Sequence, residues 1–208
     1  MNDDVLLRQL MNEIARGDDA TVLQLLGASP ALATASLNQG ATRAAATDNF
    51  LTAIHHYVYA GDTALHVAAA AHRSGIARAL IGQGADVAAR TRRGAAPLHY
   101  AADGSPGALH WDAERQAATI TVLIAAGADP NAVDMDAVTP LHRAVRTRCA
   151  AATRALLDGG ADARRPNANG STPIMLAMRQ TGRSGSGSAE AKVQQGEILL
   201  LFTRHGLA

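Results

Sequence analysis

The chain is poor in cysteine and in aromatic residues, and both shortages limit what it can be. Cys149 is its only cysteine and aromatics make up 3% of its 208 residues. One cysteine excludes an internal disulfide and fits a reducing compartment. With few rings available, a core must be built from close-packed Ala, Leu, Val and Ile.

Long apolar runs and a strong charge of either sign are also missing. No stretch approaches the roughly 18 consecutive apolar residues that span a membrane, and the acidic N-terminal residues do not fit a secretory signal. The net charge is +1, which is too balanced to predict nucleic-acid or membrane binding. We therefore expect a cytoplasmic protein. Lys192 is the only lysine, and Arg, Ala and Gly are frequent, a composition that indicates a bacterial coding sequence.

Two short motifs recur in register along the chain. The first occurs four times, starting at Thr63, Ala96, Thr139 and Thr172 with spacings of 33, 43 and 33 residues, as Thr-Ala-Leu-His, Ala-Pro-Leu-His, Thr-Pro-Leu-His and Thr-Pro-Ile-Met. The second, Gly-Ala-Asp, starts at Gly84, Gly127 and Gly160. Two motifs in register at a period of 33 residues predict a solenoid of small helical units.

These motifs resemble those of the ankyrin repeat family over residues 62–208, and more loosely over residues 1–61. The resemblance implies an all-α fold, in which helix-turn-helix units stack side by side and β-hairpin-like loops join them. Such units are unstable alone and bury their apolar faces only against neighbours. The family's usual role is to hold partner proteins.

The unit at residues 62–94 shows how the sequence would build this fold. Thr63 can cap a first helix, because its hydroxyl accepts a hydrogen bond from a free N–H group. In later units Pro97, Pro140 and Pro173 stand at the first helical position, where a missing N–H costs nothing. Gly84 ends the second helix in the left-handed conformation.

We expect one domain over residues 1–208, divided by the repeat frame. Its parts are N-terminal capping helices (1–37), an enlarged connection (38–61), three repeats (62–94, 95–137 and 138–170), and a C-terminal capping repeat with a Gly/Ser-rich insertion (171–208). Whether the connection contains a helix is open at this point. Ala137 stands where the other units have a turn glycine, so we expect that hairpin to be distorted.

Catalytic and metal-binding motifs are missing, so we expect no enzymatic activity, no cofactor and no metal. His66, His99 and His142 recur at the repeat spacing and would lie roughly 10 Å apart, too far to share a zinc ion. The resemblance implies structural hydrogen bonds for them instead. His55 and His56 are adjacent, which makes a poor chelate if they lie in a strand.

A partner protein would bind to the hairpin tips and to the ends of the first helices, which line the concave face in the ankyrin family. Carried over to this sequence, with a tryptophan from an inserted loop, the predicted partner-binding residues are Tyr57, Tyr59, Asp62, Arg92, Arg93, Asp103, Trp111, Met135, Asp136, Arg146, Asn169 and Arg179. Tyr, Trp and Arg supply most binding energy at interfaces, and paired arginines favour an acidic partner segment. We expect the isolated chain to be a monomer.

Two alternatives remain open at this point. A small molecule could bind in a notch around Trp111, Tyr100 and Asp103, walled by the inserted loops at 104–114 and 181–195. Trp111 could equally pack against its own repeat. The chain could instead be an immunity or regulatory partner of a neighbouring enzyme.

Overall fold

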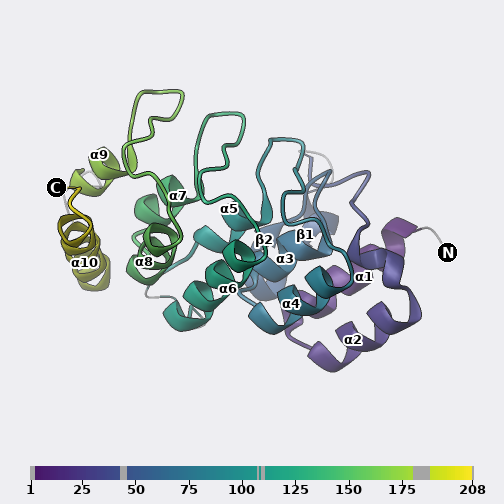
Figure 1. The fold of residues 1–208 in the computed structure, drawn as a ribbon. Coiled ribbons are helices and arrows are strands. Elements are labelled where there is room, and N and C mark those ends of the chain that lie inside the picture. Colours follow the sequence, from purple (N-terminus) through teal and green to yellow (C-terminus); the bar gives the residue numbers. More distant parts are fainter. Residues whose placement is uncertain (1–2, 43–45, 107, 109–110, 180–187, 208) are drawn as a thin grey trace.

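Two layers of helices form a stack in the computed structural model, which describes residues 3–42, 46–106, 108, 111–179 and 188–207. Each inner helix contacts the next inner helix, and each outer helix contacts the next outer helix. The hairpin loops project from one side of the stack (Figure 1). The inner helices are α1 (Asp3–Arg16), α3 (Ala64–Ala70), α5 (Pro97–Ala102), α7 (Pro140–Arg146) and α9 (Pro173–Met178), and the outer helices are α2 (Asp19–Ala28), α4 (Ser74–Gly82), α6 (Ala113–Ala125), α8 (Ala150–Asp158) and α10 (Ala189–Arg204). The predicted all-α solenoid is confirmed.

The connection between α2 and α3 contains no α-helix in its described residues. It consists of the 3₁₀ turns η1 (Pro30–Ala33), η2 (Thr47–Asn49) and η3 (Thr52–Ile54) and the short strands β1 (Phe50–Leu51) and β2 (His56–Tyr57). The strands pair antiparallel, with Leu51 opposite His56. His55 is not in the strand, because its φ of 48° ends η3.

The core follows from the small number of aromatic residues. Leu10, Leu65, Leu98 and Leu141 on successive inner helices are each 0% exposed. Alanines fill the space between them, which lets the inner helices approach closely. Phe202 on α10 is the one fully buried phenylalanine and closes the last repeat. Helix α10 begins at Ala189, and most of the Gly/Ser-rich insertion lies outside the described residues.

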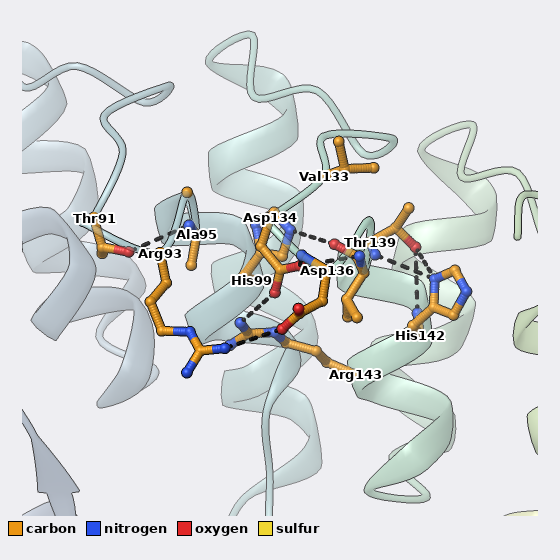
Figure 2. A network of polar contacts seen from close by, with 12 residues as sticks. Thr91, Arg93, Ala95, His99, Val133, Asp134, Asp136, Thr139, His142 and Arg143 are labelled. Atoms are coloured by element: carbon orange, nitrogen blue, oxygen red, sulfur yellow. Dashed lines mark hydrogen bonds and ion pairs between the residues drawn. The ribbon is translucent and has the colours of Figure 1, made fainter. Parts of the chain in front are cut away.

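A histidine and a threonine close the start of an inner helix together. The Thr63 side chain accepts a hydrogen bond from the His66 N–H, and His66 Nδ1 accepts one from the Thr63 N–H at 3.2 Å. Thr139 and His142 form the same pair (Figure 2). Ala96 has no side-chain acceptor, so only the N–H to His99 Nδ1 bond remains in that repeat. Each such bond satisfies a donor that helix geometry leaves free.

The other nitrogen of each histidine reaches the next repeat. Nε2 lies 3.2 Å from the Ala95 carbonyl oxygen for His66, 3.0 Å from that of Val138 for His99, and 2.9 Å from that of Ser171 for His142. Because Nδ1 already accepts, Nε2 carries the proton and donates it. Every acceptor is the residue just before the N-cap of the next inner helix. The predicted structural role of these histidines is confirmed.

Burial keeps these histidines neutral. It lowers the pKa of His66 to about 4 and that of His99 to about 4, and for His99 the nearby Arg143 cation lowers it further. Burial also lowers the pKa of His142. A second proton on Nδ1 would face the backbone N–H that it now accepts from, so protonation breaks the cap.

We predict that stability falls as the pH drops from about 6.5 towards about 4. In this window the unfolded histidines bind protons and the folded ones do not, so the free energy of unfolding decreases by at most about 2 kcal/mol per histidine between pH 7 and pH 5. Asp62 opposes this loss, because burial raises its pKa to about 6 in the folded state. The loss of stability from His66 and His99 together is larger than the gain from Asp62. Urea denaturation at several pH values measures the slope.

The variant His99→Gln provides the control for that slope. It removes one titrating group, so its pH slope should be smaller than that of the wild-type protein by about one proton, whatever its stability at pH 7. An unchanged slope in this variant would contradict the assignment.

The predicted distortion of the third hairpin is wrong. Ala137 adopts a φ of 55°, in the left-handed region that Gly94 and Gly170 occupy in the neighbouring hairpins. The Ala137 N–H bonds to Asp134 O just as the Gly94 N–H bonds to Thr91 O. Alanine therefore accepts a strained backbone conformation, and the hairpin keeps its shape.

We predict that Ala137→Gly raises the free energy of unfolding by about 1 kcal/mol, because glycine adopts this conformation without the Cβ clash. The matched control is Gly94→Ala, whose new Cβ would also lie 3.3 Å from Met135 N and which should lower stability. Equal effects of the same sign, measured by chemical denaturation, would refute this explanation.

Candidate partner-binding surface

The hairpin tips form one continuous exposed row. Backbone hydrogen bonds join successive tips, from Arg92 N to Ala60 O, from Met135 N to Arg93 O and from Ala168 N to Asp136 O. The Met135 side chain is 73% exposed. The predicted tip residues Arg92, Arg93, Met135, Asp136 and Asn169 are all exposed, and their backbones are held in fixed positions.

Arg143 of α7 lies among the ends of the inner helices and links two repeats. It donates to Asp103 Oδ2 at 2.9 Å and to Asp134 Oδ2 at 3.1 Å. Figure 2 shows Arg93 and Arg143 reaching Asp136 and Asp134 from opposite sides. The Arg143 side chain is 17% exposed, and the carboxylate of Asp103 raises its pKa against the lowering effect of burial. Two carboxylates thus fix this cation between α5 and the third hairpin.

The more exposed ion pairs of this surface contribute little. Arg93 to Asp136 spans 3.1 Å, with side chains 74% and 63% exposed. Arg146 lies 3.7 Å from Asp103 and is 61% exposed. Solvent-exposed pairs typically stabilise by at most about 1 kcal/mol. Arg146, and the exposed Arg179 of the next repeat, remain available to a partner.

Asp62 was wrongly predicted at the surface, because it is 0% exposed. Its carboxylate accepts hydrogen bonds from the Tyr59 N–H at 2.7 Å and from the Tyr100 hydroxyl at 2.8 Å. Desolvation raises the pKa of Asp62 to about 6, opposed by these two donors. The same burial raises the pKa of Tyr100. Asp62 cannot contact a partner and serves instead to fix Tyr100.

The connection covers part of the concave face. His56 of β2 packs on the Tyr100 ring with centroids 4.9 Å apart, and Tyr100 is 6% exposed. Tyr57 is 40% exposed and Tyr59 is 42% exposed. Tyr57 packs on Phe50 at 4.7 Å. The inner helix α5 is thus covered by the chain itself, whereas Met175 and Met178 on α9 are exposed.

Trp111 packs against its own repeat. Its indole Nε1 donates to Gln116 Oε1 at 2.9 Å, and its half-buried ring lies against the core. A Cβ added at Gly104 would lie 2.8 Å from that nitrogen and 2.6 Å from Cys149 Sγ, so the space beside it is filled. The packing alternative is favoured over the notch. The second proposed wall, at 181–195, lies partly outside the described residues.

A pocket of about 810 Å³ lies between the connection and the hairpins. Two of its lining residues, His56 and Arg143, each have a buried nitrogen, Nε2 and Nε, without a hydrogen-bond partner in the described structure. The full lining is Arg8, Asn38, Gln39, Gly40, Ala41, Thr42, Asn49, His56, Tyr59, Ala60, Thr91, Arg92, Arg93, Ala95, Tyr100, Asp134 and Arg143.

Sequence reasoning missed Arg8, His56 and Arg143 as site residues. One signal was present for Arg143, because it follows the motif histidine just as Tyr100 does one repeat earlier, and that position faces the groove. Arg8 and His56 had no such signal, since the enlarged connection lies outside the repeat frame.

The described part of the chain offers neither a metal-binding cluster nor an activated thiol. No group of three or more His, Cys, Asp or Glu side chains there could hold a metal ion. Burial raises the pKa of the Cys149 thiol to about 11, which makes it a poor nucleophile. Among the helices with described residues, none is long and apolar enough to cross a membrane.

Comparison with known families agrees with this architecture. The family model described as ankyrin repeats (3 copies) matches residues 109–186, and the one described as ankyrin repeat matches residues 60–92. Together they cover more than half of the chain. Comparison with curated proteins finds no match. Ankyrin repeats generally mediate binding to other proteins, and this chain belongs to the ankyrin repeat family.

Proposed function

We propose that the chain is a non-enzymatic module that binds another protein through the hairpin tips and the inner-helix ends of its third and fourth repeats. The observation that carries the proposal is the contrast along the concave face. The connection covers Tyr100 on α5, whereas Met135, Arg146, Met178 and Arg179 are exposed further along.

A prearranged surface favours binding. The backbone hydrogen bonds between successive tips and the Arg143 bridges hold the loops in place before a partner arrives. Little conformational entropy is then lost on docking. Exposed Met135 and Met178 offer adaptable apolar contacts to a partner.

Charge favours an acidic partner segment. Arg146 and Arg179 are exposed and lie on successive repeats, so they form a short line of cations along the concave side. Guanidinium groups bind carboxylates in a bidentate geometry. The chain would act as a monomer that presents this line to its partner.

Affinity capture from a lysate of the native cell tests the proposal. The triple variant Met135→Ala, Arg146→Ala, Arg179→Ala removes one apolar and two cationic contacts from the proposed surface. We expect it to lose the proteins that the wild-type chain captures, because truncating an interface anchor often costs 2 kcal/mol or more, about a thirtyfold loss of affinity.

A matched variant on the outer layer controls for general effects. Leu23, Arg115 and Arg154 are exposed on α2, α6 and α8, and changing all three to Ala also removes one apolar and two cationic side chains. This variant should capture the same proteins as the wild-type chain. If the outer-layer variant loses them and the first one keeps them, the surface assignment is wrong.

A further inference from the structure

The pocket beneath the connection is separate from the surface proposed for protein binding. Its volume of about 810 Å³ is within the roughly 300–1,000 Å³ of small-molecule sites. One wall is the connection at residues 38–42 and 59–60, and the other is the second hairpin at residues 91–95. The wall at residues 38–42 and 59–60 belongs to the enlarged connection, which interrupts the repeat frame. The pocket therefore exists because of this connection.

Arg8 of α1 lines the pocket and links that helix to the connection. Its guanidinium donates to Gln39 O at 2.7 Å and to the Asn49 side chain. A further backbone bond, from Ala41 N to Val58 O, holds the two sides of the connection together.

The charge of the lining is strongly positive. Four arginines line the pocket with a single carboxylate, that of Asp134. That carboxylate is already bound to Arg143 and to the backbone N–H groups of residues 136 and 138. Arg92 is exposed, and its guanidinium has no hydrogen bond within the described structure. The pocket therefore offers cationic donors and has no free carboxylate to repel an anion.

The rest of the lining suits an apolar body. The rings of His56, Tyr59 and Tyr100 and the methyl groups of Ala41, Ala60 and Ala95 contribute to the walls. Binding sites for small molecules typically combine such apolar walls with a few polar groups that orient the ligand. The unpartnered nitrogens of His56 and Arg143 add polarity at the floor.

We propose that this pocket binds a small organic acid, with its carboxylate at Arg92 and its aromatic or aliphatic body against the tyrosine rings. Arg143 shares its charge with Asp103 and Asp134, so Arg92 is the main anchor. The site goes beyond the protein-binding surface, and none of the residues changed in the capture experiment lines it.

Titration of the full chain with 2-naphthoate tests the proposal, with backbone and arginine Nε–H signals followed by NMR. We expect a saturable change with a Kd of about 1 mM, the affinity that a ligand of this size typically attains. The changes should be confined to the residues that line the pocket. The neutral isostere 2-naphthamide and inorganic phosphate, which lacks an apolar body, should each bind at least about tenfold more weakly.

Two substitutions of the same kind make the test specific. Arg92→Gln should raise the Kd of 2-naphthoate about tenfold, because it removes a charge-assisted bond. Arg165→Gln, at an exposed arginine in the last hairpin, should leave the Kd unchanged. Equal binding of the acid and the amide, equal binding of phosphate, or no effect of Arg92→Gln would overturn the proposal. The capture experiment would stand in any of these cases.

Discussion

One hydrogen bond per junction, from a neutral histidine to a carbonyl group, links three pairs of neighbouring repeats. His66, His99 and His142 each close the start of their own helix with Nδ1 and reach the next repeat with Nε2. Both bonds require that the ring hold a single proton on Nε2, so the stack depends on a protonation state as well as on apolar burial. The last repeat has Met175 at this position.

The histidine-to-carbonyl hydrogen bonds also position the hairpins. Each accepting carbonyl lies at the base of a hairpin, and backbone bonds between tips extend the order outwards. Arg143 adds an electrostatic link between Asp103, the C-cap of α5, and Asp134 in the third hairpin. The exposed tip residues therefore lie on a backbone that these repeated hydrogen bonds hold in place. This is the physical basis of the binding role proposed for this chain.

The sequence predicted what the repeat frame controls and missed what breaks it. Thr63, Pro140 and Gly84 indicate caps and helix ends through local chemistry, so they were placed correctly. Asp62 shares a hairpin position with Ala95 and was expected at the surface, but this position is buried in both hairpins. The bond from the Tyr100 hydroxyl to Asp62 comes from another repeat and leaves no periodic signal. The prediction for Ala137 was wrong because the repeat frame was stronger than expected. Hydrogen bonds to the neighbouring hairpins hold Ala137 in the left-handed backbone conformation that glycine prefers.

The nitrogen chemical shifts of the three histidine side chains test the central claim most directly. The account predicts that at pH 7 His66, His99 and His142 are all neutral, with the proton on Nε2 and none on Nδ1, and that His66 and His99 stay so at pH 5. A proton on Nδ1 at pH 7, or doubly protonated rings at pH 5 in the folded chain, would contradict it.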